Sequence, residues 1–403
     1  KVVTTLDYKA QKAVNDAIIN NLRNYGLTKD NTQAAVFSFS PIDGKIIAYA
    51  GGKDYTKSQY DRVTQAVRPP GSSFKPFVYA AAMEKGISPN DMIEDRPVTL
   101  GTWSPHNYGN KYRGKIPVYT ALMVSSNVCA ARMIQEVGVR AVIQTARVLG
   151  IETPLEYDYT IALGSNGVKL FEFTRAYGAF ANGGFVVQPY SVERVETSRG
   201  KVVYKAPKTK ISHQLSMNTA AEMTAMLKTV MSNGTGRAAN IGKPAAGKTG
   251  TTDDNKDAYF VGYTPNIVTG VWVGNDDNTV MSKIVQGGTV PALIWRDVMK
   301  VATEPYGKAE FNYPEVQLIP FAAGSNVKII GGDDNAEKPK EEEEKPVNLD
   351  DVTAVTPADV VKNANKKNAE QPVSAPVAPK PAAPAKPAAA PIPIPMAVPE
   401  SLH

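Results

Sequence analysis

Apolar residues over much of the chain recur every three to four positions, the spacing that places them on one face of an α-helix. Residues 7–22 show this pattern first, with Ala10, Val14, Ala17 and Ile18 on the apolar face. The same spacing predicts further helices at residues 77–85, 118–137, 171–181 and 219–231. The middle of the chain is therefore predicted to be largely helical.

Two pairs of β-rich segments flank this helical region. Residues 34–39 and 45–50 lie on either side of the turn sequence Pro41-Ile42-Asp43-Gly44, and residues 258–263 and 266–274 are separated by a second turn. Each pair predicts a β-hairpin. Strands at both ends with helices between them imply an α+β domain in which the terminal segments share one antiparallel sheet.

The composition of the chain changes near residue 320. Residues 321–403 hold 13 of the 30 prolines, and of the 11 Phe, 18 Tyr and 3 Trp residues only Phe321 lies there. Such a segment cannot bury a core, and its Ala, Pro, Lys and Glu runs are typical of disorder with some polyproline II. We therefore expect a folded domain over residues 31–320, preceded by a linker and first helix in residues 1–30 and followed by a disordered tail over residues 321–403.

Charge and cysteine content exclude several classes of function. The net charge of +6 divides into +9 for residues 1–320 and −3 for the tail, so the basic body suits an anionic partner such as a membrane surface or a cell-wall polymer. Because the chain has no dense Lys/Arg run, nucleic acid is not a predicted partner. Cys129 is the only cysteine, which rules out an internal disulfide and a Cys-based zinc site.

The sequence carries no targeting or membrane-spanning segment that can be recognised. No stretch approaches the ~18 apolar residues of a membrane span. The chain begins at Lys1 rather than at an initiator Met or a signal peptide, so we expect a fragment that lacks an upstream targeting or anchoring segment. Localisation must then be inferred from function.

Two common hydrolase schemes fit the sequence poorly. It lacks a Gly-x-Ser-x-Gly elbow, and apart from the terminal His403 only His106 and His213 are available as bases for a Ser-His-Asp triad. His106 lies in a Ser-Pro-His-Asn-Tyr-Gly loop, where a turn or surface role is expected. There is no His-Glu-x-x-His motif either, so a catalytic transition metal is not predicted.

Residues 242–249 match the phosphate-binding loop pattern Gly-x-x-x-x-Gly-Lys-Ser/Thr letter for letter. Such a loop must follow a buried strand and open a helix whose N-terminal amides hold the phosphates. Here Lys248-Thr249-Gly250 is followed by Thr-Thr-Asp-Asp, which favours a strand that runs into a turn. We therefore disfavour a nucleotide site and predict that Lys248-Thr249-Gly250 ends a strand at the edge of the sheet.

A Ser-x-x-Lys pair on a helix can act as an acyl-transfer unit, because residues three apart share a helix face. An uncharged Lys amine can then take the proton of the Ser hydroxyl. The pattern occurs three times, at Ser72/Lys75, Ser198/Lys201 and Ser325/Lys328. Only Ser72 follows a chain breaker, Pro69-Pro70-Gly71, and stands at the start of a hydrophobic helix, where the helix dipole favours developing negative charge.

A Ser-x-Asn triplet also occurs three times, at Ser88/Asn90, Ser125/Asn127 and Ser216/Asn218. Only Ser125-Ser126-Asn127 has strongly apolar helical sequence on both sides. Alone, this triplet could be a helix cap or a satisfied buried polar group, and Lys248-Thr249-Gly250 alone could be a polar turn. The order Ser-x-x-Lys, Ser-x-Asn and Lys-Thr-Gly in one chain instead favours a shared active site.

In these three motifs the sequence resembles the active-site serine penicillin-recognising enzymes, and among them the transpeptidase domain of bifunctional class A penicillin-binding proteins. Similar stretches also occur at residues 4–7, 60–62, 68–77, 107–109, 180–184, 234–236 and 270–276. The resemblance spans residues 1 to about 300, roughly three quarters of the chain, and the tail lies outside it. Pro69 is a departure, because these proteins often have a polar residue there, and it slightly alters the turn before Ser72.

The resemblance implies D,D-transpeptidation of peptidoglycan through a serine acyl-enzyme. Ser72 would attack the carbonyl between the two D-alanines of a stem peptide and release the terminal D-Ala. Lys75 would be its general base, with a pKa lowered by burial and by the positive charge of Lys248. Ser125 would pass the proton to the leaving amine, and Asn127 would position Lys75 and the substrate amide.

The same resemblance implies how the substrate is held. Lys248, Thr249 and Thr251 would bind the terminal carboxylate of the donor peptide, which would lie along the edge strand as an added strand. Gly250 would let the substrate backbone approach that strand, and the backbone amides of Ser72 and Thr251 would form the oxyanion hole. β-Lactam antibiotics, which mimic D-Ala-D-Ala, would acylate Ser72.

The family fold is α+β: a five-stranded antiparallel sheet flanked by helices, with an adjoining helical subdomain, as in serine β-lactamases. The resemblance implies no cofactor, and its partners are donor and acceptor stem peptides and β-lactams. Full-length members carry an upstream glycosyltransferase domain and a membrane anchor. The catalytic domain would accordingly lie on the extracytoplasmic side of the cell membrane.

A D,D-carboxypeptidase or β-lactamase, and a non-catalytic β-lactam sensor, are alternatives with the same constellation of residues. They differ from a transpeptidase in the fate of the acyl-enzyme. A β-lactamase needs a base that activates water for deacylation, and the nearest candidates, Glu152 and Glu156, lack the expected surroundings. Transpeptidation is therefore the preferred hypothesis.

Overall fold

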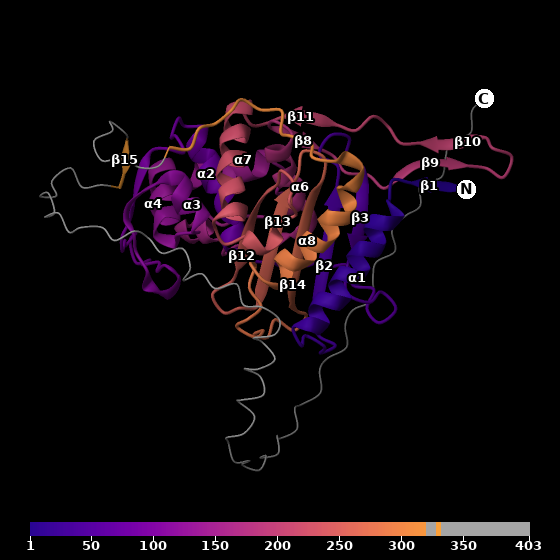
Figure 1. The fold of residues 1–403 in the computed structure, drawn as a ribbon, viewed down its shortest axis with the longest axis horizontal. Coiled ribbons are helices and arrows are strands. Elements are labelled where there is room, and N and C mark those ends of the chain that lie inside the picture. Colours follow the sequence, from indigo (N-terminus) through magenta and orange to yellow (C-terminus); the bar gives the residue numbers. More distant parts are fainter. Residues whose placement is uncertain (320–327, 332–403) are drawn as a thin grey trace, which may run out of the picture. The chain divides into compact units, whose positions relative to one another are not determined.

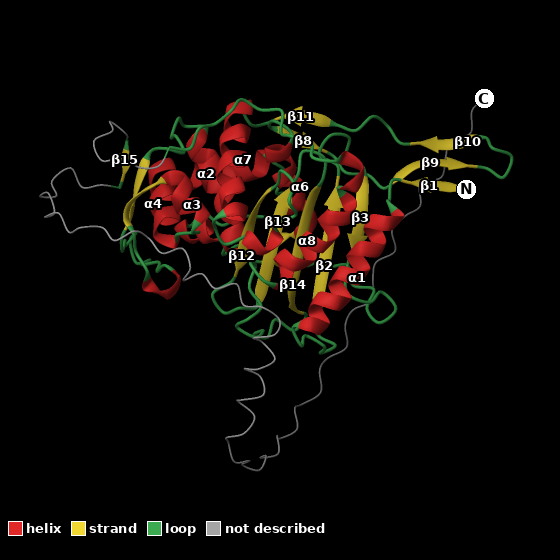
Figure 2. Cartoon of the chain, viewed as in Figure 1, coloured by secondary structure: helices red, strands yellow, loops and turns green. Residues whose placement is uncertain are grey.

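A five-stranded antiparallel sheet lies at the centre of the protein, whose computed structural model describes residues 1–319 and 328–331 (Figures 1 and 2). Its spatial order is β12, β13, β14, β2, β3, with bounds Thr32–Phe39 for β2, Ile46–Ala50 for β3, Ala246–Thr251 for β12, Asp257–Tyr263 for β13 and Val268–Asn275 for β14. Both predicted hairpins are present, and β14 pairs with β2 from Val268↔Phe39 to Asn275↔Thr32. This confirms that segments far apart in the sequence share one sheet.

Two helices cover one face of this sheet (Figure 1). They are α1 (Tyr8–Asn24), whose apolar stripe predicts it, and α8 (Val290–Ala302), which the spacing analysis overlooks. The side chain of Asp7 begins α1 by accepting a hydrogen bond from Ala10 N (2.8 Å). Trp295 of α8 belongs to the same buried cluster as the apolar residues of α1, so the two helices seal this face together.

The opposite face of the sheet is buried against a helical subdomain. Neighbouring strand residues alternate between the two faces, so Phe37 and Trp272 join this second core while Val36 and Val271 join the first. The helices of this side are α2 (Lys75–Met83), α3 (Val118–Met123), α4 (Asn127–Val137), α5 (Val139–Val148), α6 (Leu170–Ala181) and α7 (Met217–Ser232).

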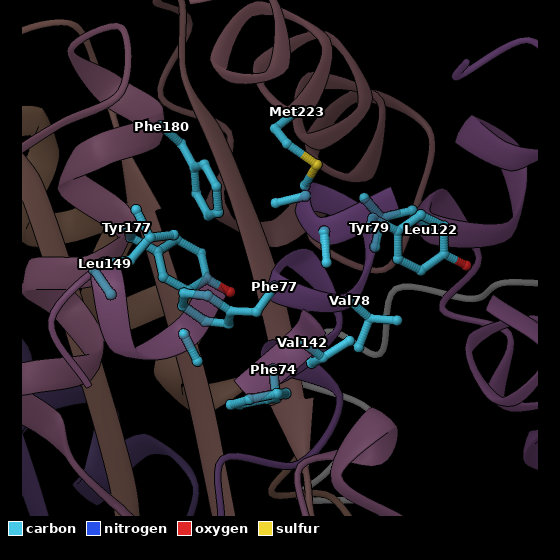
Figure 3. Packing of buried hydrophobic residues seen from close by; sticks show 14 of the residues in the cluster. Phe74, Phe77, Val78, Tyr79, Leu122, Val142, Leu149, Tyr177, Phe180 and Met223 are labelled. Carbon is cyan, nitrogen blue, oxygen red and sulfur yellow. The ribbon is translucent and has the colours of Figure 1, made fainter. Parts of the chain in front are cut away.

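Helix α2 lies at the centre of the second core, since all nine of its residues are buried. Figure 3 shows Phe77 of α2 beside Tyr177 and Phe180 of α6, with ring centroids 5.7 and 5.9 Å away. A helix that is apolar on all sides is stable only when neighbours surround it. Its position carries the first residue of the helix, Lys75, into the protein interior.

The helix predicted over residues 118–137 is in fact two helices, α3 and α4, with a turn at residues 124–126 between them. Ser125 has a φ of 61°, in the left-handed region that interrupts a right-handed helix. Ser126 then caps α4, because its hydroxyl accepts a hydrogen bond from Cys129 N (3.1 Å). Ser and Asn side chains compete with the helix for backbone hydrogen bonds, an effect that apolar spacing does not register.

Short strands form four small sheets in the part of the chain that the structure describes. Their bounds are Val2–Thr4 for β1, Val67–Arg68 for β4, Met92–Asp95 for β5, Gly114–Pro117 for β6, Val168–Lys169 for β7, Phe185–Val187 for β8, Val192–Glu196 for β9, Val202–Lys205 for β10, Ile211–His213 for β11 and Ile329–Ile330 for β15. The sheets are β1-β9-β10, β11-β8, β15-β5-β6 and β4-β7. Over the described residues, no helix combines the length and the hydropathy needed to cross a membrane.

Strand β15 lies inside the range predicted to be a disordered tail. It runs parallel to β5, with Ile329↔Met92 and Ile330↔Ile93, and Ile330 is buried. Composition assigns residues 328–331 to the tail, whereas two of their β-branched residues extend the edge of an existing sheet. The domain boundary near residue 320 stays a prediction. The rest of the predicted tail, residues 320–327 and 332–403, lies outside the described residues, and its disorder stays a prediction.

Candidate active site

Ser72 lies on η1 (Gly71–Phe74), a 3₁₀ turn that leads directly into α2 at Lys75. Gly71 has a φ of 55°, and a Cβ at this position would lie 2.5 Å from Thr251 O. Only glycine lets this turn pack against the C-terminal end of β12. Ser72 is half-buried, and its hydroxyl has no hydrogen-bond partner among residues 1–319 and 328–331, so it is available to a ligand.

The Lys75 side chain is fully buried, and its amine reaches the turn between α3 and α4. Nζ donates to Ser125 O (2.6 Å) and to Asn127 Oδ1 (2.7 Å), and it lies 3.3 Å from Ser125 Oγ. Burial lowers the pKa of Lys75 to about 7, because the charged amine loses its hydration. Near neutral pH a large fraction of the amine is therefore uncharged, as a general base must be.

Lys248 brings a second buried amine to the same place from β12. Its Nζ donates to Ser125 Oγ (2.8 Å) and to Thr249 O (3.1 Å). Burial lowers the pKa of Lys248 well below its usual value, and the charge of Lys75 lowers it further. Burial is the main cause of the low pKa of both amines, and their mutual repulsion disfavours the state in which both carry a charge.

Asn127 opens α4 and fixes the amine of Lys75 through its side-chain oxygen. Its Nδ2 donates to His106 O (2.7 Å), and its backbone N donates to Asn107 Oδ1 (2.8 Å). The loop around His106 thus supports the site with its backbone, while the imidazole itself is exposed, which agrees with the predicted surface role.

Strand β12 lies at the edge of the sheet, as predicted for the Lys-Thr-Gly motif. Thr249 Oγ1 and Thr235 Oγ1 are 2.7 Å apart and form one hydrogen bond. Because this bond uses the hydrogen of one hydroxyl, the hydrogen of the other can be donated to a ligand. Thr251 Oγ1 accepts a hydrogen bond from Gly287 N (3.0 Å), which leaves its own hydrogen able to donate. One hydroxyl donor from the Thr249–Thr235 pair, a second from Thr251 and the amine of Lys248 therefore lie on or beside this edge strand.

The packing around Gly250 gives a structural reason for glycine at this position, in addition to the one that the resemblance implies. A Cβ there would lie 2.1 Å from Pro70 O and 2.6 Å from Ser73 Oγ. The backbone that approaches Gly250 in the structure is that of the turn carrying Ser72. The missing side chain therefore lets η1 dock on β12, which brings the nucleophile and the Lys-Thr-Gly strand together, and the approach of the substrate backbone to Gly250 stays a prediction.

Other motifs of the sequence fall outside this site. Residues 242–249 run into β12 and then through a turn into β13, so the helix that a phosphate-binding loop requires is missing at this place. Ser198 lies in the turn between β9 and β10, and Ser325 lies outside the described residues. Ser216 caps α7, and His213 is exposed on β11. Of the motifs within residues 1–319, those of Ser72, Ser125 and Lys248 lie together.

Comparison with known proteins identifies the arrangement. The sequence profile of the penicillin binding protein transpeptidase domain matches residues 34–300. The chain belongs to this family. Penicillin-binding protein 1A of Rickettsia conorii is 33% identical over 363 residues, which cover 83% of this chain and 44% of that protein. Penicillin-binding protein 1A of Neisseria lactamica is 35% identical over 284 residues, which cover 67% of this chain and 36% of that protein. The chain thus spans less than half the length of these curated relatives.

Solved structures of penicillin-binding proteins share the fold. PonA1 from Mycobacterium tuberculosis in complex with penicillin V has a TM-score of 0.70 and 27% identity, covering 80% of this chain and 90% of that one. Penicillin-binding protein 1A from Haemophilus influenzae has a TM-score of 0.71 at 24% identity, and the match covers 79% of this chain and 68% of that one. The predicted fold of a five-stranded sheet with a helical subdomain is therefore confirmed.

Within this penicillin-binding protein domain, the two glutamates considered for a β-lactamase base are engaged elsewhere. The Glu152 side chain is 74% exposed, and its carboxylate pairs with Arg175 of α6 (3.0 Å). Glu156 is also exposed. Among residues 1–319, neither carboxylate bonds to Ser72 or Lys75.

The sequence alone assigns no role to three residues whose side chains support the site. Asn107 and Thr235 lie at residues 107–109 and 234–236, in stretches that resemble the family. Their place in these stretches could have indicated that they belong to the site. Asp95 is an acidic residue at the end of a short apolar strand, and nothing in its neighbourhood along the chain points to the site.

Proposed function

We propose that the chain is the D,D-transpeptidase domain of a class A penicillin-binding protein, which cross-links peptidoglycan stem peptides through an acyl-enzyme on Ser72. The observation that supports this most is the convergence of two buried amines, those of Lys75 and Lys248, on Ser125 Oγ. A neutral amine one helical turn from a serine is what an activated nucleophile requires. The penicillin V complex of a relative with 27% identity supports reactivity with β-lactams.

In the first half-reaction, the Ser72 oxygen forms a bond to the carbonyl carbon of the penultimate D-Ala while its proton moves to the neutral amine of Lys75. The peptide bond to the terminal D-Ala then breaks. The leaving nitrogen receives a proton through the Ser125 hydroxyl, which lies between the amines of Lys75 and Lys248. In the second half-reaction an acceptor amine attacks the ester, and the protons move in reverse to free Ser72.

The edge of β12 would bind the donor peptide. Its unpaired main-chain groups suit an added strand, and Thr249, Thr251 and Lys248 would receive the terminal carboxylate. That carboxylate would favour the charged form of Lys248, because an anion near a buried amine stabilises its positive charge. The close packing of Gly71 on Thr251 supports an oxyanion hole formed by the backbone amides of Ser72 and Thr251.

For the whole protein we propose the organisation of a class A enzyme. Its upstream part would hold a membrane anchor and a glycosyltransferase domain, and the transpeptidase domain, over residues 31–320, would work on the extracytoplasmic side. The support is that the curated relatives are named penicillin-binding protein 1A and that the chain matches less than half of their length. No cofactor takes part in the proposed reaction.

Intact-protein mass spectrometry after a brief exposure to penicillin tests the proposal. One stable penicilloyl adduct is expected per chain, located on Ser72, lost in Ser72→Ala and retained in Ser198→Ala. With a stem pentapeptide and an acceptor amine, the parent should release D-Ala and form a cross-linked product. An adduct on another serine would refute the site, rapid penicillin turnover would indicate a β-lactamase, and acylation without D-Ala release would indicate a sensor.

A further inference from the structure

The carboxylate of Asp95 is fully buried and contacts the turn between α3 and α4. Four donors surround it: Asn107 Nδ2 (2.6 Å), Ser126 Oγ (2.7 Å) and Cys129 Sγ (3.7 Å) at Oδ1, and Arg113 N (3.1 Å) at Oδ2. The partly exposed guanidinium of Arg113 adds an ion pair, with Nη1 3.7 Å from Oδ2. Burying a carboxylate is strongly unfavourable unless such donors replace its hydration. Asp95 is thus held in the core by a specific set of groups, one of which belongs to the Ser-x-Asn motif.

Asn107 connects this carboxylate to the start of α4. Its amide nitrogen donates to Asp95, and its Oδ1 accepts from Asn127 N (2.8 Å) and Val128 N (3.2 Å). These backbone groups belong to the first turn of a helix, where N–H groups have no partner within the helix. The neighbouring carbonyl of His106 accepts from Asn127 Nδ2 (2.7 Å), so one loop holds both the backbone and the side chain of Asn127.

The turn that is held in this way is strained. Ser125 has a φ of 61°, a conformation that costs energy for a residue with a side chain and persists only where surrounding contacts fix it. The hydroxyl of the next residue, Ser126, lies 2.7 Å from Asp95 Oδ1 and 3.1 Å from Asn107 Oδ1. In this conformation the turn presents Ser125 O and Oγ to the amine of Lys75.

We propose that Asp95 and Asn107 are positioning residues for acylation: their buried hydrogen bonds hold the turn at residues 125–127 in the geometry that receives the amine of Lys75. The inference rests on the proposed function of Ser72 as the nucleophile. Neither residue touches the reacting atoms, and both act through the turn. Loss of either should therefore slow acylation of a protein that remains folded.

Asp95 also acts on Lys75 through its charge. Besides burial, which lowers the pKa of Lys75, Cys129, Asp253 and Asp95 would raise it as anions, and Lys248 faces the same hydroxyl from β12. Burial raises the pKa of the Cys129 thiol, which keeps it neutral at physiological pH, and Asp253 is exposed, so that solvent screens its charge. Asp95 is therefore the buried anion that resists loss of the Lys75 proton, and its removal should lower the pKa of Lys75 further.

Two substitutions separate geometry from charge. Asp95→Asn keeps the shape of the side chain and removes its charge, whereas Asn107→Ala keeps the charge and removes the bridge to α4. The rate constant for acylation by a fluorescent penicillin is measured from pH 5 to pH 9, with thermal unfolding in parallel. We expect both variants to be acylated about 10- to 100-fold more slowly at pH 8. Only Asp95→Asn should move the rising limb of the pH profile to lower pH.

Glu172 offers a matched control, because it is another buried carboxylate that accepts hydrogen bonds from Glu152 N (3.0 Å), Thr153 N (2.8 Å) and Thr153 Oγ1 (2.7 Å). Glu172→Gln should lower the melting temperature and leave acylation per folded molecule unchanged. If Asp95→Asn behaves in the same way, Asp95 is merely structural and the inference is overturned.

The remaining outcomes are also decisive. If Asp95→Asn does not fold, Asn107→Ala decides by the same criterion, since a folded Asn107→Ala variant with the parental acylation rate contradicts positioning. If the parent itself is not acylated on Ser72, the proposed function fails. Acylation of the parent on Ser72 together with unchanged rates in both variants would refute only the positioning roles.

Discussion

We expect acylation of Ser72 by a β-lactam to accelerate as the pH rises and to level off just above neutrality. Lys75 accepts the Ser72 proton only when its own amine is neutral, and burial lowers its pKa from 10.5 to about 7. The neutral fraction is then about 1% at pH 5, about half at pH 7 and about 90% at pH 8. The rate constant should therefore rise about 90-fold from pH 5 to pH 8 and little beyond, whereas an unshifted lysine would keep raising it about tenfold per pH unit.

Time courses with a fluorescent penicillin at constant ionic strength give this profile directly. Lys75→Arg keeps the positive charge but cannot act as a base, so it should lose at least about 100-fold in rate and the rising limb with it. Lys85→Arg is the matched control, because Lys85 follows the same helix and its Nζ donates to Val137 O (2.5 Å), outside the site. A rate that still climbs between pH 8 and pH 9.5 would refute the lowered pKa. A folded Lys75→Arg variant within tenfold of the parent would make Lys75 only a structural cation.

Three further changes test other parts of the structure. Gly250→Ala should destabilise the protein by about 1–3 kcal/mol, because the new Cβ would meet a carbonyl oxygen at 2.1 Å; an unchanged denaturant midpoint would contradict the packing role. Truncation to residues 1–319 should lower the melting temperature by several degrees relative to residues 1–331, because Ile330 is buried beside β5; equal melting temperatures would mean that β15 adds no stability. Lys248→Ala should slow acylation by carboxylate-bearing β-lactams at least about tenfold, while the parent shows no saturable binding of a fluorescent ATP analogue; micromolar binding that this substitution abolishes would restore the phosphate-loop interpretation.

The parts of the site that could be predicted are those whose residues lie close together in the sequence. Ser72 and Lys75 are one turn apart on a helix, so their proximity follows from helix geometry. The sheet was predictable for a similar reason, because β-rich segments and turn residues are local signals, as at Pro41-Ile42-Asp43-Gly44 between β2 and β3. Helix α8 could also have been predicted, since Pro291 at its first turn is compatible with a helix start.

Other features depend on contacts that no local pattern encodes. The break at Ser125 is stabilised by Asp95 and Asn107, which lie 31 and 19 residues before Ser126 in the chain. Apolar spacing continues through the turn, so it predicts one helix where the buried polar network enforces two. In the same way, composition describes residues 321–403 as a tail, while the pairing of Ile330 with β5 depends on a partner far upstream.

The pairing of β2 with β14 also has a consequence for how the protein is made. Thr32 and Asn275, which hydrogen-bond across these strands, are 243 positions apart. Closing so long a loop lowers the entropy of the chain before the stabilising contacts have formed, so topologies of this kind fold slowly. The β2–β3 hairpin comes early in the chain, so the edge of β2 stays unpaired until β14 is available. The catalytic centre, which needs β12 as well, can therefore form only once the chain includes β14, and shorter nascent chains keep an unpaired strand and lack the assembled site.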